Sequence, residues 1–518
     1  MNSVPERGDV ERHEAAFIKL FGGNLLVTLA NLLRDVAIAV AFGASVATDN
    51  FFLAISIPIF LLTVASGAWR SVVVPLLARI ARQQQASFTA IARRLTGAST
   101  AGVTLVALAL ALLSVAFYLF VPAGPAPQGV ISVTGFATLV LPMYCLAAFT
   151  ELGQGPLQAR HRLFVPNLAR AVMPVGLILS AWLVGDRLGV LALVPGGTLG
   201  ALAGAAIIAV LMAREGILPG LTTKPLPAAD RSTLVGNFWA LVTATSITYL
   251  SPLIGQWMAG GLGPGAVSYL GYANRLTTGA ISLVTGSLAP VLLGFYATRV
   301  ASGGISAVRS AFITMSCAFS WVGCAMSLGT WLSSDYLVDL VYQHGEFTQQ
   351  DAESVRLLVD CYALGFPMIL VAVASNTLIS ALSRNAVFIP IGVALLLSTV
   401  IANFLLMQWL GVAGIALASS LVYGVSLVLL NGYLQRGGGL GVSVGEWLQI
   451  ATPFGVLAIA GLAPLWWSVR IDAELQSADV LAAILVLTAF LAIAVFANRE
   501  FLRSYLTAWR ARRPPAQG

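Results

Sequence analysis

Long apolar runs follow one another along almost the whole chain, separated by short polar segments. A helix needs about 20 apolar residues to cross the hydrocarbon core of a bilayer. By that rule the pattern predicts an all-α polytopic membrane protein with about fourteen transmembrane helices. The expected spans are 17–42, 50–78, 96–121, 132–157, 164–185, 188–212, 232–260, 266–297, 308–342, 354–383, 386–409, 412–434, 446–469 and 478–498.

The composition agrees with a membrane location. Apolar residues make up 58% of the 518 positions, and charged residues only 9%. Soluble domains carry about 25% charged residues, so this chain lacks the polar side chains needed to cover a water-exposed surface. The net charge of +7 comes from short basic clusters at the ends of apolar runs. Because these clusters form no stripe or patch, they do not indicate nucleic-acid binding.

The loop charges predict the orientation of the chain. Short cytoplasmic loops accumulate Lys and Arg, and every second loop here is basic. The segments between the basic loops carry few basic residues, and those near 122 and 260 carry none. We therefore expect a multi-pass protein of the cytoplasmic (inner) membrane with both termini in the cytoplasm. The basic loop residues are Arg79, Arg82, Arg93, Arg94, Arg160, Arg162, Arg214, Lys224, Arg231, Arg299, Arg309, Arg384 and Arg436.

The chain resembles itself at a shift of about 220 residues. ARHRLFVP at 159–166 matches SRNAVFIP at 383–390, with Arg, Phe and Pro in corresponding places. A repeat of six spans preserves orientation, so it predicts two parallel six-helix lobes related by a pseudo-twofold axis along the membrane normal. Shared small-residue composition is the alternative explanation. The expected parts are an N-terminal lobe 1–213, a linker 214–231, a C-terminal lobe 232–437, an extra helix pair 446–498 and a basic tail 499–518.

A few charged residues fall inside the spans, where each needs a partner or a watery cavity. Two interpretations of Arg34 remain open. In one, it forms a structural ion pair with a carboxylate on a neighbouring helix, because Asp35 lies on the adjacent face. In the other, Arg34 and Arg275, from matching helices of the two lobes, converge on an anionic headgroup, since guanidinium binds phosphate through two hydrogen bonds.

The remaining intramembrane charges also have two interpretations each. Arg70 either binds substrate or extends to the cytoplasmic boundary of its span. Arg170 either extends to the boundary of its span or pairs with Glu151. Asp360 and Glu151 are candidates for ion coupling, with a buried hydrogen-bonded or paired role as the alternative.

The sequence predicts no enzymatic or metal chemistry. Cys145, Cys317, Cys324 and Cys361 lie in apolar runs without CxxC spacing or a nearby histidine cluster, so we expect them to contribute to packing. No GxxxxGK[ST] motif occurs, and the chain therefore carries no nucleotide-driven motor of its own. We expect a transporter that needs no cofactor and is not an enzyme.

Several segments resemble one family. RDVAIAVAFGASVATDNFFLAISIP at 34–58 is similar to the signature of the MurJ/MviN-type lipid II flippases of the MOP exporter superfamily. The segments 267–276, 344–367 and 384–436 resemble the same family in its spans 8, 10, 11 and 12. The resemblance covers nearly the whole chain. It implies export of an undecaprenyl-pyrophosphate-linked glycan to the outer leaflet, with cavity arginines binding the pyrophosphate.

The resemblance also assigns candidate substrate-binding residues. Arg34, Arg275, Asp35 and Asp49 match family positions, and Asn274 stands where the family has Asp. Other family charges are absent: two expected arginines are Thr28 and Leu62, and an expected acid is Thr278, while Arg70 offers a replacement on the second span. A partial arginine set fits either lipid II or an exopolysaccharide or O-antigen repeat unit.

The main hypothesis is a flippase for a lipid-linked glycan precursor that works by alternating access. A cation-coupled multidrug exporter of the same superfamily is the first alternative, and it would depend on Asp35, Glu151 and Asp360. A membrane scaffold for polysaccharide-assembly enzymes is the second. The expected partners are the polyprenyl-pyrophosphate-linked glycan, the lipid bilayer and glycan-assembly enzymes.

Overall fold

A computed structural model describes residues 7–83, 88–98, 100–102, 131–160, 162, 164–220, 228–436 and 439–468. These residues are almost entirely helical. Among them, seven helices are long and apolar enough to cross a membrane, or eight if the bent pair Val133–Leu139 and Leu141–Ala159 forms one span. The chain is therefore a polytopic α-helical membrane protein, as its apolar pattern predicts.

The chain divides into two compact units, which are described separately. The first unit contains residues 1–272 and 341–351. Its helices are α1 (Arg7–Phe42), α2 (Val46–Gln83), α4 (Val133–Leu139), α5 (Leu141–Ala159), α6 (Phe164–Leu168), η1 (Ala169–Ala171), α7 (Val172–Leu188), η2 (Gly189–Ala192), α8 (Leu193–Arg214) and α9 (Ala228–Ala259).

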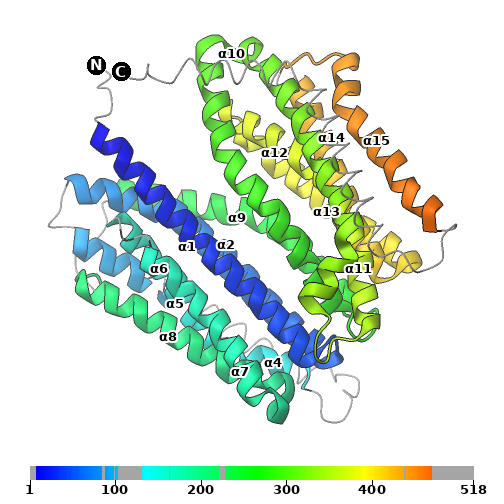
Figure 1. Ribbon diagram of the computed structural model, residues 1–518. Coiled ribbons are helices and arrows are strands. Elements are labelled where there is room, and N and C mark those ends of the chain that lie inside the picture. The colour runs from blue at the N-terminus through cyan, green and yellow to red at the C-terminus, as the bar shows by residue number, and fades with distance from the viewer. Residues whose placement is uncertain are drawn as a thin grey trace, which may run out of the picture. The chain divides into compact units, whose positions relative to one another are not determined.

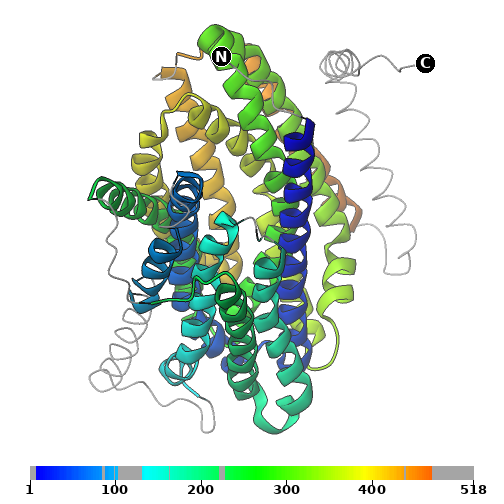
Figure 2. The same ribbon diagram turned by 90° about the vertical axis from the view of Figure 1, so that its left-hand side faces the viewer.

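Helices of the first unit pack closely through small residues. Helix α7 lies beside α8, α5 contacts both α8 and α2, and α1 lies against α6 and α7 (Figures 1 and 2). A Cβ added to Gly176 on α7 would lie 2.4 Å from the carbonyl oxygen of Gly196 on α8. Only glycine permits this approach, which is typical of contacts between membrane helices.

The second unit contains residues 273–340 and 352–518. It includes most of α10 (Ala266–Tyr342), and then α11 (Gln349–Ala363), α12 (Phe366–Ala381), η3 (Asn385–Val387), α13 (Phe388–Leu410), α14 (Val412–Arg436) and α15 (Val444–Ser468). The 77-residue α10 is broken at Gly303 and Gly304, and Gly304 has a φ of +65°. Glycine adopts this left-handed conformation readily, so α10 represents two spans rather than one continuous helix.

Most of the expected spans coincide with these helices. The break at 303–304 separates the expected spans 266–297 and 308–342, while 354–383 corresponds to α11 and α12 together. The span 478–498 and most of 96–121 lie outside the described residues. The total of fourteen spans therefore stays a prediction.

The boundaries of the two units differ from those of the predicted lobes. Helix α9, which the repeat assigns to the C-terminal lobe, packs against α2 and belongs to the first unit with the beginning of α10. Hydrophobic periodicity locates helices but carries no information on which neighbours they contact. The predicted six-plus-six lobes and their pseudo-twofold axis stay a prediction.

Candidate functional site

Arg34 and Asp35 form a buried ion pair within α1. Arg34 Nε and Nη2 donate to Asp35 Oδ1 at 2.8 and 2.6 Å, and Nη1 donates to Asn31 Oδ1 at 3.0 Å. The two residues are only 6% and 3% exposed. Every guanidinium nitrogen therefore has an acceptor, and the charge of Arg34 is balanced inside the helix that carries it.

This arrangement corrects one expectation from the sequence. One of the two interpretations of Arg34 placed its ion-pair partner on a neighbouring helix, because consecutive helical residues project in different directions. The arginine side chain is long enough to bend back toward the carboxylate of the next residue. The direction of the Cβ atoms does not exclude this contact, because the length of the arginine side chain determines where its guanidinium can lie.

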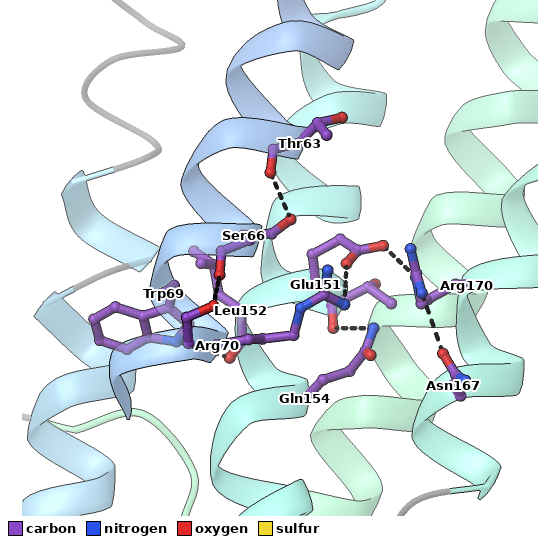
Figure 3. A network of polar contacts seen from close by, with 12 residues as sticks. Thr63, Ser66, Trp69, Arg70, Glu151, Leu152, Gln154, Asn167 and Arg170 are labelled. Atoms are coloured by element: carbon purple, nitrogen blue, oxygen red, sulfur yellow. Dashed lines mark hydrogen bonds and ion pairs between the residues drawn. The ribbon is translucent and has the colours of Figure 1, made fainter. Parts of the chain in front are cut away.

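Three helical segments of the first unit bring Arg70, Glu151 and Arg170 together. Glu151 on α5 lies between Arg70 of α2 and Arg170 of η1 (Figure 3). Arg170 Nε donates to Glu151 Oε1 at 2.5 Å, and Arg70 Nη1 donates to Oε2 at 3.3 Å. The expected pairing of Arg170 with Glu151 is confirmed. We call these three residues the arginine triad.

Further polar groups lie around the arginine triad. Arg170 also donates to Asn167 Oδ1 at 3.2 Å, and Trp69, next to Arg70, donates its indole N–H to the Leu152 carbonyl oxygen at 3.2 Å. Gln154, one turn after Glu151, is fully buried, and its Oε1 has no hydrogen-bond partner among the described residues. These contacts fix the helices around the arginine triad.

Asp49 links the first turn of α2 to the first turn of α10. Its Oδ1 accepts hydrogen bonds from the backbone N–H and hydroxyl of Ser268, at 2.8 and 2.6 Å. The first turn of a helix has backbone N–H groups without intrahelical acceptors and a partial positive charge. Asp49 therefore caps α10. The sequence identified Asp49 as a candidate residue, but not Ser268 as its partner.

A second carboxylate lies at the same end of the first unit. Asp351 accepts hydrogen bonds from the hydroxyl of Tyr269 at 2.7 Å and from the backbone and side chain of Thr348, each at 2.9 Å. The segment also contacts α1, because the N–H of Glu346 donates to the Val40 carbonyl oxygen at 2.9 Å. Nothing in the sequence pattern indicated these contacts.

Arg275 and Asn274 belong to the second unit. The Arg275 side chain is exposed, and Asn274 Oδ1 accepts a hydrogen bond from the hydroxyl of Thr278 at 2.9 Å. Thr278 stands where the resembled family has an acid, and here it serves to orient Asn274. Because Arg34 and Arg275 lie in different units, their predicted convergence stays a prediction.

Asp360 lies near a charged cluster of the second unit. Arg356, one turn before it on α11, pairs with Asp335 and Asp339 of α10. The Oδ1 of Asp360 is buried and has no hydrogen-bond partner among the described residues. No group of three or more metal-binding side chains occurs in the part of the chain that the structure describes.

Buried charges within a bundle of long apolar helices are typical of multi-pass membrane proteins that move substrates across the bilayer. The architecture is like that of a solved structure described as an inward-facing multidrug resistance MATE family transporter of the MOP superfamily, with a TM-score of 0.61 at 14% identity, covering 82% of this chain and 99% of that one. It is also like a solved "Lipid II flippase MurJ, inward closed conformation", with a TM-score of 0.72 at 19% identity, covering 94% and 100%. At these identities the likeness shows the fold alone.

Sequence comparison identifies the family. The profile described as "Lipid II flippase MurJ" matches residues 38–496, and this chain belongs to that family. A lipid II flippase MurJ of Burkholderia cenocepacia is 27% identical, covering 88% of this chain and 90% of that protein. A probable lipid II flippase MurJ of Thermotoga maritima is 26% identical, covering 79% and 83%.

Proposed function

We propose that this protein moves a polyprenyl-pyrophosphate-linked glycan precursor from the cytoplasmic to the outer leaflet of the cytoplasmic membrane. The observation that carries the proposal is the family match over residues 38–496, supported by relatives aligned over most of both chains. The protein acts by alternating access and makes or breaks no covalent bond. Its substrate is lipid II or an exopolysaccharide repeat unit, and both share the pyrophosphate.

Arg34 and Arg275 are proposed to bind the pyrophosphate during this movement. Asp35, Asp49, Arg70 and Asn274 are the other proposed substrate-binding residues. In the structure, the carboxylate of Asp35 accepts hydrogen bonds from Nε and Nη2 of Arg34. A phosphate oxygen binds the same fork of N–H groups as a carboxylate does. Substrate binding at Arg34 therefore exchanges one anion for another, and Asp35 prevents an unpaired charge when no substrate is bound.

The membrane potential supplies the driving force in this proposal. Moving an anionic headgroup outward from a negative interior is favoured by about 2.3 kcal/mol per charge per 100 mV. The same field draws the empty, positively charged binding region back toward the cytoplasm. We expect collapse of the potential to slow turnover in sealed vesicles. An unchanged rate in depolarised vesicles would exclude this driving force.

A multidrug exporter is the second candidate function. It is favoured by the fold shared with MATE transporters and by Asp360, whose Oδ1 has no partner among the described residues. A cationic substrate requires a carboxylate, whereas a pyrophosphate requires arginines. Asp360→Asn should therefore abolish drug efflux if this function is correct, and Arg275→Gln should leave it intact. The flippase proposal expects the opposite sensitivity.

Native mass spectrometry of the full-length protein purified from its own membranes tests the main proposal. We expect a co-purified ligand whose mass equals that of a polyprenyl pyrophosphate carrying a glycan, and whose amount falls in Arg275→Gln. A non-transporting scaffold would retain glycan-assembly enzymes but no such lipid. Absence of the lipid from protein purified out of membranes that contain it would contradict the proposal.

A further inference from the structure

The arginine triad carries more positive than negative charge. Two guanidinium groups, Arg70 and Arg170, share the single carboxylate of Glu151. A charge inside a membrane span needs a partner or contact with water. The Arg70 and Arg170 side chains are 27% and 25% exposed, compared with 13% for Glu151. The excess charge of +1 is therefore accessible from outside the packed helices.

The two arginines are held unequally. Arg170 has a 2.5 Å contact with Glu151 and a second acceptor in Asn167. Arg70 is 3.3 Å from Glu151, longer than the 2.7–2.9 Å that is usual for a charge-assisted hydrogen bond. Among the described residues, this long contact is the one hydrogen bond of Arg70. Most of its N–H groups therefore stay available for a further anion.

The arginine triad lies about two helical turns from the Arg79 and Ala159 ends of α2 and α5. Arg70 precedes Arg79 by nine residues on α2, which is about 13 Å along a helix. Glu151 precedes Ala159, the last residue of α5, by eight residues, or about 12 Å. Arg79 is exposed and pairs with Asp230, and the loops at this end are the basic ones assigned to the cytoplasm. With the orientation that the loop charges predict, the triad lies in the cytoplasmic half of the spans, where a lipid headgroup enters from the inner leaflet.

From this charge excess and position we infer that the arginine triad is a phosphate-binding subsite for the pyrophosphate of the lipid-linked precursor, separate from Arg34. The inference rests on the proposed function. A phosphate accepts two parallel hydrogen bonds from one guanidinium, and Arg70 has N–H groups free for this purpose. Glu151 keeps Arg170 in place and competes with the phosphate for Arg70. The unsatisfied Oε1 of Gln154 lies close to this polar region (Figure 3).

Glu151 makes the inference testable, because its two interpretations predict different effects of Glu151→Gln on anion affinity. If the triad is only a structural ion network, Glu151→Gln lowers the stability of the protein and does not raise its affinity for an anion. If it is a phosphate subsite, Glu151→Gln raises the local charge from +1 to +2 and removes the competing carboxylate. Affinity for a lipid phosphate should then rise, while Arg70→Gln should lower it.

The experiment is an equilibrium titration of the full-length protein in detergent with radiolabelled undecaprenyl pyrophosphate. A hydrogen bond to a charged group contributes more free energy than one between neutral groups, so we expect Arg70→Gln to weaken binding about tenfold or more. Arg70→Lys should retain part of the affinity, and Glu151→Gln should bind several times more tightly than the unmodified protein. Arg79→Gln, on the same helix, is the matched control and should change affinity by less than about twofold. Thermal unfolding establishes that each variant is folded.

Two further probes separate the sources of phosphate. Undecaprenol lacks the phosphates and should bind equally to the unmodified protein and to Arg70→Gln. Phosphatidylglycerol has a phosphate, and an equally large loss of its binding in Arg70→Gln would show a general phospholipid site and overturn the inference.

The outcomes also distinguish the two proposals. Normal undecaprenyl pyrophosphate binding by folded Arg70→Gln, or unchanged or weaker binding by folded Glu151→Gln, overturns the subsite and leaves the flippase proposal standing. An unmodified protein that binds no undecaprenyl pyrophosphate contradicts both.

Discussion

The Arg34–Asp35 pair and the arginine triad contain the same kinds of side chain in the same unit, yet they differ in charge balance and exposure. The pair is balanced one to one and almost fully buried. The triad has one excess positive charge and arginines that are about a quarter exposed. The difference teaches that an intramembrane arginine can already be paired with an anion of the protein and then binds substrate only by exchange. Its acceptors and its exposure determine whether it is ready to bind an anion.

The largest expected effect comes from breaking the buried pair. Arg34→Gln leaves Asp35 charged and unpaired, and removing one partner of a buried pair costs about 3–5 kcal/mol. The double variant Arg34→Gln with Asp35→Asn should recover most of this loss, because no charge is left alone. Thermal unfolding of the purified variants measures both. Equal destabilisation in the single and double variants would show that the pair is not balanced as described.

Asp49 provides a case in which a carboxylate is balanced by a helix terminus and not by an arginine. Asp49→Ala removes the acceptor of two hydrogen bonds from Ser268, with an expected loss of about 1.5–3 kcal/mol. Asp49→Asn keeps an acceptor oxygen and should lose less than Asp49→Ala. The free energy of unfolding in urea measures the difference. Identical losses for Asn and Ala would contradict capping of α10.

A smaller effect is expected in the arginine triad. Glu151→Gln should lower the free energy of unfolding by about 1 kcal/mol, because Arg70 and Arg170 are partly solvated and need less compensation than Arg34. The same unfolding measurement applies. A loss as large as that of Arg34→Gln would show that the triad is a structural pair like the first and would remove the contrast between them.

The smallest effect is expected at an exposed ion pair. Arg162 donates to Glu215 at 3.0 Å with a largely exposed side chain. Exposed pairs contribute roughly 0–1 kcal/mol, so Arg162→Gln should change the midpoint of thermal unfolding very little. It serves as the baseline for the three larger changes. A shift comparable to that of Glu151→Gln would make exposure a poor guide in this protein.

Much of the fold was predictable from the sequence, because the length and apolarity of a membrane span are set by the bilayer itself. The expected spans over α1, α2 and α5 to α15 correspond to helices, and the glycine break at 303–304 lies in a predicted loop. The lobe to which α9 belongs stays a prediction, and its packing against α2 could not be predicted from the repeat. Helix contacts depend on side-chain shape, which hydropathy does not describe.

The candidate site was predictable only in part. Arg34, Arg70, Arg170 and Glu151 could be found because a charge inside an apolar run is conspicuous. The pairing of Arg34 with Asp35 was missed, as were Ser268 and Tyr269, which are uncharged and give no such signal. Glu151 is 81 residues from Arg70 and 19 residues from Arg170 in the sequence. Its position between the two arginines arises only on folding and could not be found from the sequence.

Transfer across reconstituted membranes tests the central claim most directly. Vesicles containing the full-length protein are loaded with a polyprenyl glycan linked through pyrophosphate, or with the same glycan linked to the polyprenol without phosphate, and appearance of the glycan in the opposite leaflet is followed with time. We predict rapid transfer of the pyrophosphate-linked lipid and a rate for the phosphate-free lipid no faster than in protein-free vesicles. Equal rates for the two lipids, or no transfer of either above the protein-free rate, would contradict an anion-binding flippase.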